Sequence, residues 1–232
     1  MAVHFVPEQL LLPRFEVASK PTDGLFFAIL PDDVTAHRIA ELARSLRSKY
    51  RLQGKPLLPK RFHVSLYRLG DYFGLPQDAI ARAEEAASAI TLAPFEIGCD
   101  HVISFAGRNP DPERDNYAIV LRATEGVAEL TALRQRLAAA MERSGIKSPG
   151  KRRFTPHVTL LYDRPREISV PVDSIRWTVR ELVLVHSLLG KTRYELKRLT
   201  SAPTRIPARS APCISEDSMR SAAAIRQGRT SA

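Results

Sequence analysis

Two short segments of the chain carry the same order of chemically useful residues. The first reads FHVSLY and contains His63 and Ser65, and the second reads FTPHVTL and contains His157 and Thr159. In each, the histidine stands two positions before the hydroxyl residue. Alternate side chains of an extended strand point to the same face. If each segment is a strand, it therefore presents an imidazole beside a hydroxyl on one face and packs its apolar residues on the other.

Paired imidazoles and hydroxyls suit acid–base chemistry at a phosphate. An imidazole has an ordinary pKa of about 6.5, so near neutral pH His63 and His157 can divide the roles of proton donor and proton acceptor. Such catalysis contributes on the order of 10²–10⁴-fold per group. Ser65 and Thr159 can donate hydrogen bonds to the non-bridging oxygens, where negative charge develops. A strained 2′,3′-cyclic phosphate at an RNA end is a suitable substrate for these two imidazoles and two hydroxyls. We expect the reaction to need neither a metal nor a cofactor.

The charge balance favours a polyanionic substrate. The 232 residues contain 35 Lys and Arg against 25 Asp and Glu, which gives a net charge of +10. Basic residues precede both motifs, with Arg61 before the first and Arg153 before the second. Cations beside candidate catalytic groups suit RNA or nucleotides. We expect Arg61 and Arg153 to contact substrate phosphates, while a merely solvated basic face is the alternative.

Aromatic residues beside the motifs are candidates for stacking on bases. By strict alternation Tyr67 shares the face of His63, whereas Tyr162 falls on the face opposite to His157. We therefore expect Tyr67 to be the stacking residue. Phe154 is a second substrate-binding candidate, although a place in the core suits a phenylalanine at least as well.

Other patterns in the sequence indicate neither a metal site nor a triphosphate site. The two cysteines lack the spacing of a zinc motif, and no acidic or cysteine residue near the motif histidines supplies a recognisable third ligand. Residues 190–192 read GKT, like the end of a P-loop, but position 185 is Val where that motif needs Gly. His101 and His186 lie in alternating, strand-like runs and are expected to be structural.

The periodicity of apolar residues predicts the elements that hold the motifs. Strands are indicated at residues 24–30, 62–68, 95–105, 117–123, 157–162, 177–185 and 194–199. Helices are indicated at residues 32–50, 76–90 and 130–145. Because strands and helices mingle without regular alternation, the pattern favours an α+β fold with largely antiparallel strands.

The two ends of the chain differ from the region between them. Residues 1–22 are broken by prolines and are expected to be a loosely attached lead-in. Residues 204–232 lack aromatic residues and are rich in Ser, Ala, Pro and Arg, which predicts a basic, disordered tail. Residues 23–203 then form one domain of two lobes. No run approaches the roughly 20 apolar residues of a membrane-spanning helix, and no secretory signal is recognised. We expect a cytoplasmic monomer that does not bind membranes.

The paired H-x-[S/T] motifs with hydrophobic flanks resemble those of the 2H phosphoesterases, and especially the bacterial 2′-5′ RNA ligases and RNA 2′,3′-cyclic phosphodiesterases. The likeness runs from about Gly24 to Leu199 and includes the late LVLVHS segment at residues 182–187. The resemblance implies a bilobal α+β fold with two antiparallel sheets facing a central cleft, helices outside and a pseudo-twofold duplication. It also implies metal-independent opening of 2′,3′-cyclic phosphates to 2′-phosphates, with reversible 2′-5′ joining. By the same likeness His63 would be the general acid and His157 the general base, roles that the residues alone do not decide.

Two other functions fit the same motifs. A non-catalytic module that binds RNA ends would keep the scaffold and form no product, although pure binding does not need two titrating groups. A 2H enzyme acting on small cyclic nucleotides or on 2′-5′ oligonucleotides would differ in the size of its pocket and in its stacking groups. The chain departs from the family at Ser65, where many members have Thr, and in the residues that follow Leu199.

Overall fold

The computed structural model describes residues 20–105, 117–146, 154–189 and 194–199, and only the backbone of the last range. All of them belong to one unit of the chain, Met1–Ala202, and the second unit, Pro203–Ala232, lies outside the described residues. Most of the predicted lead-in and all of the predicted tail therefore lie outside the described part of the chain, and the domain boundaries stay predictions.

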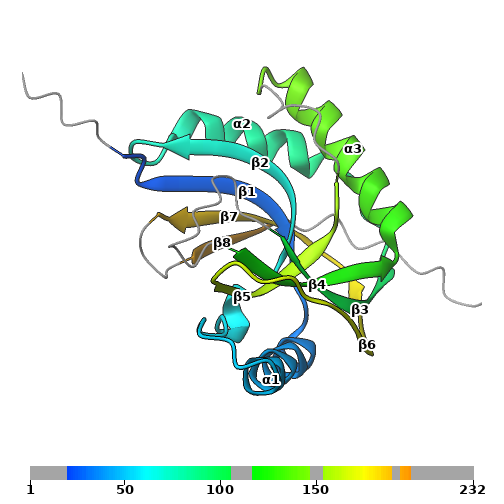
Figure 1. Ribbon diagram of the computed structural model, residues 1–232. Helices are drawn as coiled ribbons and strands as arrows, with labels where there is room; N and C mark the ends of the chain where they lie inside the picture. The colour runs from blue at the N-terminus through cyan, green and yellow to red at the C-terminus, as the bar shows by residue number, and fades with distance from the viewer. Residues whose placement is uncertain (1–19, 106–116, 147–153, 190–193, 200–232) are drawn as a thin grey trace, which may run out of the picture. The chain divides into compact units, whose positions relative to one another are not determined.

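Strands and helices alternate irregularly along the described residues (Figure 1). The strands are β1 (Asp23–Ile29), β2 (Val64–Tyr72), β3 (Phe95–Phe105), β4 (Tyr117–Glu125), β5 (His157–Asp163), β6 (Ser169–Val179), β7 (Leu182–Leu188) and β8 (Tyr194–Leu199). The helices are α1 (Asp33–Lys49), α2 (Gln77–Ser88) and α3 (Val127–Arg143), with a short 3₁₀ helix, η1 (Pro59–Arg61), before β2. None of these helices is long and apolar enough to cross a bilayer, within the residues that the structure describes.

The predicted α+β class is confirmed, and one predicted strand is wrong. The apolar run at residues 177–185 is divided between β6 and β7, which are separated by Arg180 and Glu181. β6 also begins at Ser169, well before the predicted run. The two strands do not pair with each other: β6 lies at one edge of the sheet, and β7 lies beside β1.

The described strands join into one curled antiparallel sheet in the order β6-β3-β4-β5-β2-β1-β7-β8. This order divides into two halves of similar layout, β6-β3-β4-β5 and β2-β1-β7-β8. The halves meet where Val64 of β2 pairs with Val158 of β5. The predicted pair of antiparallel lobes is confirmed, with the two sheets continuous at their contact. The two motif strands are neighbours at its centre.

Each motif strand is covered by a helix that comes from the other half. α1 follows β1 but contacts β5 and β6, whereas α3 follows β4 but contacts β2. Figure 1 shows α1 well apart from α2 and α3. The helices and both motif strands contribute to one hydrophobic core, which includes Ile39, Ala43, Leu46, Val64, Leu130, Leu133, Leu137 and Val158. The valine face of each motif strand is therefore packed, and the opposite face carries the imidazoles.

Local signals start the two helices that precede the motifs. The carboxylate of Asp32 accepts a hydrogen bond from the backbone N–H of Thr35 at 2.8 Å, which satisfies an amide in the first turn of α1. α3 begins after Gly126, whose φ of +70° lies in the left-handed region. A Cβ at that position would lie 2.3 Å from the carbonyl oxygen of Glu96, so only glycine fits. The N-terminal ends of α1 and α3 thus determine where the chain leaves the sheet before each motif strand.

Candidate functional site

The two motifs meet at the centre of the sheet. The valine in the middle of each motif is directly opposed to the other across the antiparallel β2–β5 contact. Continuing that register by one residue sets His63 opposite Thr159 and Ser65 opposite His157. Opposed side chains share a face with Cβ atoms about 4.5–5.5 Å apart, and diagonal neighbours such as the two histidines lie about 7–8 Å apart. That separation leaves room for one phosphate group between the rings.

Backbone carbonyls hold both rings in the same way. Nδ1 of His63 lies 2.8 Å from the carbonyl oxygen of Arg61, and Nδ1 of His157 lies 2.7 Å from that of Thr155. A carbonyl oxygen can only accept a hydrogen bond, so in each ring Nδ1 carries the proton and donates it. The neutral ring then has its lone pair on Nε2. In both histidines Nε2 is therefore the atom that can take up or release a proton.

A phenylalanine packs against each ring. The ring centroid of Phe26 in β1 lies 5.0 Å from that of His63, with 39° between the planes. The ring of Phe105 in β3 meets that of His157 edge-on, at 5.0 Å and 84°. These contacts restrict the orientation of both imidazoles. Phe26 and Phe105 could not be predicted as site residues, because nothing in the sequence of their strands indicates which histidine each of them contacts.

Burial lowers the pKa of both His63 and His157 below the ordinary value of 6.5. The cause is that a desolvated ring disfavours its charged form, and the carbonyl bound to each Nδ1 opposes this effect. The positive charges of His157 and Arg61 lower the pKa of His63 further. The two rings are thus coupled, since a proton on one hinders protonation of the other. The free site favours neutral rings at pH 7.

Guanidinium groups lie beside the histidines. Arg61 is half-buried at the end of η1, and its charge acts on His63 as described above. Arg122 of β4 is directly opposed to His157 in the β4–β5 register, shares its face and is half-buried. Arg122 could not be predicted as a site residue, because only the strand pairing shows which residue of β4 is opposed to His157. Arg153 lies outside the described residues.

Comparisons with known proteins identify the family of the chain. The family model described as the 2′-5′ RNA ligase superfamily matches residues 31–191. The chain belongs to the 2′-5′ RNA ligase superfamily. The predicted resemblance to the 2H phosphoesterases is thereby confirmed.

Solved structures of this superfamily share the fold. E. coli LigT complexed with 3′-AMP is 25% identical, with a TM-score of 0.56, over 78% of this chain and 97% of that one. TT0787 of Thermus thermophilus is 22% identical, with a TM-score of 0.57, over 76% and 94% of the two chains. E. coli LigT complexed with phosphate is 22% identical, with a TM-score of 0.51, over 78% and 96%. A comparison with curated proteins gives no match.

Both motif strands of this superfamily member contain a β-bulge directly after the hydroxyl residue. In β2 the residues on either side of Leu66 pair with consecutive residues of β1, so Leu66 is the extra residue. In β5 the residues on either side of Leu160 pair with consecutive residues of β4, so Leu160 is the extra residue. Because the side-chain period of a strand is two, one inserted residue reverses the face of every residue after it.

The bulges overturn the prediction for the two tyrosines. Tyr67 is only 4% exposed and packs in the hydrophobic core, so the expectation that it shares the face of His63 is wrong. Tyr162 is 47% exposed and pairs with Ala118, which lies on the same face of β4 as Arg122. Tyr162 is therefore on the face of His157, and it replaces Tyr67 as the stacking candidate.

Phe154 has a position in the packed part of the molecule. Its half-buried ring packs against the hydrophobic core. The guanidinium of Arg134 in α3 lies 5.0 Å from the ring centroid. Since α3 packs on the valine face of β2, Phe154 lies on the side opposite to the imidazoles and is not part of the proposed substrate site.

A loop that includes residues 53–57 lies beside the part of β5 that follows its bulge and forms hydrogen bonds to it. The backbone N–H of Leu57 donates to the carbonyl of Leu160 at 2.8 Å, and that of Gln53 donates to the Asp163 carboxylate at 3.0 Å. A Cβ at Gly54 would lie 1.8 Å from the carbonyl oxygen of Tyr162, so glycine is required for this approach. The loop thus supports the backbone that presents Tyr162.

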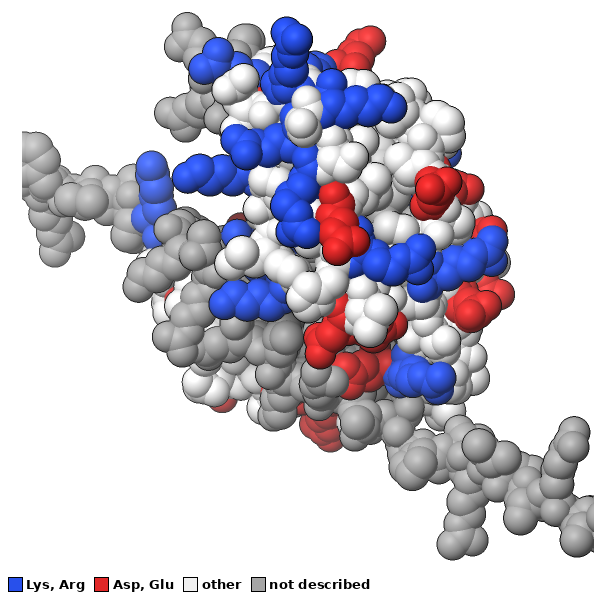
Figure 2. Space-filling view, turned by 90° about the horizontal axis from the view of Figure 1, so that it is seen from below, with Lys and Arg blue, Asp and Glu red and all other residues white. Residues whose placement is uncertain are grey.

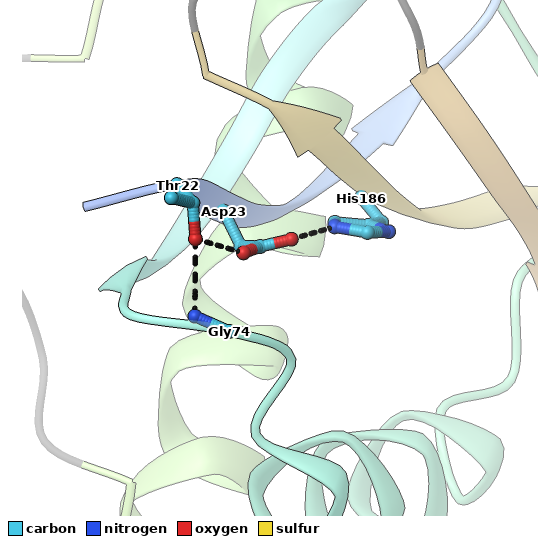
Figure 3. Close-up of polar contacts among 4 residues, drawn as sticks. All are labelled: Thr22, Asp23, Gly74 and His186. Carbon is cyan, nitrogen blue, oxygen red and sulfur yellow. Dashed lines mark hydrogen bonds and ion pairs between the residues drawn. The ribbon is translucent and has the colours of Figure 1, made fainter.

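His186 of β7 belongs to a separate network at the far end of β1 (Figure 3). Its Nε2 lies 2.5 Å from Oδ1 of the buried Asp23. The hydroxyl of Thr22 donates to Oδ2 of Asp23 at 2.5 Å and accepts from the backbone N–H of Gly74 at 3.1 Å. The bonds from Thr22 and His186 lower the pKa of Asp23 below its ordinary value. This contact agrees with the structural place that the sequence predicts for His186.

Metal donors do not gather in the part of the chain that the structure describes. No group of three or more His, Cys, Asp or Glu side chains is placed there to hold a metal ion. Cys99 is buried, and burial raises the pKa of its thiol to about 12, so the thiolate that binds metals is disfavoured. The expectation of a metal-independent reaction stays a prediction.

Proposed function

We propose that this protein is a metal-independent RNA 2′,3′-cyclic phosphodiesterase that opens the cyclic end to a 2′-phosphate. The observation that carries the proposal is the pairing of Val64 with Val158. It supports a site in which the two histidines and the two hydroxyl residues beside these valines share one face of the sheet. Membership of the superfamily supports a phosphodiesterase-type enzyme. The complex of E. coli LigT with 3′-AMP supports a nucleotide that carries a phosphate on its ribose as the kind of ligand.

The reaction needs one proton acceptor and one proton donor. Water attacks the phosphorus atom, and Nε2 of His157 takes the proton that the water loses. The bond between phosphorus and the 3′ oxygen breaks, its electron pair leaves with that oxygen, and Nε2 of His63 supplies the proton. The products are a 2′-phosphate and a free 3′-hydroxyl. The rings then return to their starting states by proton exchange with solvent. This division of roles follows the family resemblance.

The remaining polar groups stabilise the charge on the phosphate. The hydroxyls of Ser65 and Thr159 donate to the non-bridging oxygens in the transition state. Arg61 and Arg122 supply positive charge beside the histidines. Arg153 precedes the second motif in the sequence, and we propose that it contacts a substrate phosphate. We expect Arg122→Gln to raise KM for a cyclic-phosphate substrate because it removes a cation beside His157.

Substrate binding prepares the protonation state of the rings. Both pKa values are lowered in the free protein. An anionic phosphodiester placed between the rings favours the charged form of an imidazole and therefore raises both pKa values. Coupling between the rings then favours one protonated and one neutral ring, which is the state that the reaction requires.

The decisive experiment is turnover of an oligonucleotide with a 2′,3′-cyclic phosphate end in excess EDTA, with identification of the product isomer. We expect a 2′-phosphate at a rate that EDTA does not change. Dependence on an added metal ion, or a 3′-phosphate product, would overturn the proposed mechanism. When His63 or His157 is substituted in this assay, His37→Gln is the matched control, because His37 is exposed on α1 and lies outside the motifs.

Two further substrates separate the alternatives. Binding of the oligonucleotide without any product would identify a non-catalytic module. Turnover of a mononucleoside 2′,3′-cyclic phosphate in preference to the oligonucleotide would identify an enzyme for small cyclic nucleotides. Adding a strand with a 5′-hydroxyl tests 2′-5′ joining, in which that hydroxyl replaces water as the nucleophile, the bond between phosphorus and the 3′ oxygen breaks, and a 2′-5′ linkage forms.

A further inference from the structure

A second basic feature lies on helix α1. A groove of about 640 Å³ runs between the last turns of the helix and the segment that leads to η1. Its polar wall holds Arg44, Arg47 and Arg51, which follow one another at helical spacing on the same side. Its other wall is apolar, with Leu57 and Leu58. All three arginine side chains are exposed.

The charge of this groove is not neutralised within the described residues. Among them, no acidic residue lines the groove. Within the described ranges, the ion pairs and side-chain hydrogen bonds include none made by Arg44, Arg47 or Arg51. Figure 2 shows the face on which α1 lies: blue side chains gather over one part of it, and red side chains lie mainly over another. Unpaired guanidinium groups in a groove attract an anionic chain more strongly than the same charges on a flat surface.

The backbone at Arg51 is unusual for a charged residue. Its φ of +51° is in the left-handed region, at the position where helices commonly end on glycine. The backbone N–H of Leu52 donates to the carbonyl of Arg47 at 2.9 Å, as expected for such a helix end. A glycine would adopt this conformation without strain. An arginine here therefore costs stability locally and places a third cation in the groove.

The groove is close to the candidate catalytic site along the chain. Pro59 lines the groove and begins η1. It stands four positions before His63, so the two α-carbons are at most about 14 Å apart. Lys60 and Arg61 lie between them and extend the run of positive charge. A single RNA strand whose end is at His63 reaches the groove by passing around η1, from the face of the imidazoles to the side of α1.

We propose that the α1 groove binds the phosphodiester backbone of the RNA substrate, upstream of its reacting end. The inference rests on the proposed function and adds a preference for long substrates over mononucleotides. The arginines contact phosphates and so bind without regard to sequence, while Leu57 and Leu58 offer an apolar wall to the sugars and bases.

Two assays separate this inference from the proposed reaction. The first is fluorescence anisotropy with a long oligonucleotide that ends in an ordinary 3′-hydroxyl, measured over a series of salt concentrations. This ligand is not consumed, so its binding does not depend on turnover. The second is steady-state kinetics with a long and a dinucleotide substrate, each with a 2′,3′-cyclic phosphate end.

The double variant Arg44→Gln/Arg47→Gln removes two groove cations and keeps good helix formers. We expect weaker binding of the long oligonucleotide, with a salt slope shallower by about 0.7 for each arginine lost. KM for the long substrate should rise about tenfold, and KM for the dinucleotide and kcat should not change. Arg38→Gln is the matched control, because Arg38 is exposed on the same helix but does not line the groove.

Arg51→Gly separates binding from folding. We expect this variant to unfold at a higher temperature, since it relieves the backbone, and yet to bind the long oligonucleotide more weakly. Restoring charge with Arg44→Lys/Arg47→Lys should recover part of the affinity.

Each result bears on one claim. Unchanged oligonucleotide binding in the double variant, or an equal loss in Arg38→Gln, would overturn the groove as an RNA site. If the double variant instead loses binding to vesicles of anionic phospholipid and still binds RNA as the wild type does, the groove is a site for a membrane surface and the proposed RNA site is overturned. If the wild-type protein turns over neither cyclic substrate but its RNA binding still depends on Arg44 and Arg47, the proposed reaction fails and the groove stands.

Discussion

His63 and His157 differ from His186 in the ring nitrogen that is hydrogen-bonded to the fold. The two motif histidines donate Nδ1–H to backbone carbonyls, so the lone pair of each neutral ring is on Nε2. His186 instead binds the carboxylate of Asp23 through Nε2. At the motifs the bond orients the ring through Nδ1, whereas in the second network the bond joins β7 to β1. The hydrogen-bond partner therefore distinguishes the two kinds of histidine.

Removing the rings of His63 and His157 should have the largest effect. We expect His63→Ala and His157→Ala each to lower kcat/KM for a 2′,3′-cyclic phosphate by about 10²–10⁴-fold, because each removes one proton-transfer group. Thermal unfolding should show that both variants still fold, since the valine face of each motif strand stays packed. His186→Gln is the control and should leave kcat/KM unchanged. Near-normal turnover in either motif variant would refute the two-histidine mechanism.

A substrate with sulfur in place of the 3′ bridging oxygen assigns the two roles. A thiolate is a good leaving group and needs little help from an acid. This substrate should therefore restore much of the activity of His63→Ala and little of that of His157→Ala. The opposite pattern would exchange the acid and the base.

The pH profile sharpens the comparison further. Because the pKa values of His63 and His157 are both lowered from 6.5 in the free protein, the singly protonated site is most populated in mildly acidic solution. We expect a bell-shaped profile of kcat/KM with its maximum below pH 6.5. The profile of kcat should be shifted to higher pH, since the bound phosphate favours the charged rings. A maximum of kcat/KM above about pH 7 would contradict the effect of burial.

The smallest expected effect is at Asp23. The pKa of this carboxyl is lowered from its ordinary value of 3.8, so its charged form stabilises the folded state. That stabilisation is present above pH 3.8 and is lost as the pH falls through the lower, folded-state value. Asp23→Asn should lower the unfolding temperature by a few degrees at pH 7, and the difference from the wild type should shrink in acid.

The readout for Asp23→Asn is calorimetry over a pH series together with kcat/KM. Activity at room temperature should be unchanged. A loss of turnover without a change in unfolding temperature would show that the Asp23 network serves the reaction, and the contrast between the two kinds of histidine would fail.

The sequence predicted the pairing of imidazole with hydroxyl because that feature depends only on the period of a strand. His63 and Ser65 stand before the bulge in β2, so alternation holds for them. It fails for Tyr67, since the inserted Leu66 turns it into the core. Leucine is common in regular strands, and neither Leu66 nor Leu160 is a glycine or another residue type that marks a bulge. The sequence therefore gives no sign of either bulge.

Contacts between distant strands could not be predicted either. Arg122 and Phe105 reach His157 through the register of β4 and the curl of the sheet, which are properties of the assembled fold. The apolar run at residues 177–185 was interpreted as one strand because its break, Arg180 and Glu181, contains neither glycine nor proline. In the structure that break carries the chain from one half of the sheet to the other.

The exchange of helices between the halves limits how the molecule can move. α1 leaves β1 to cover β5, and α3 leaves β4 to cover β2, so separating the halves would strip both motif strands of their apolar cover. Hinged opening, as in enzymes whose lobes have their own cores, is therefore coupled to unfolding. The same packing that keeps the chain folded therefore holds the two motif histidines at a constant separation.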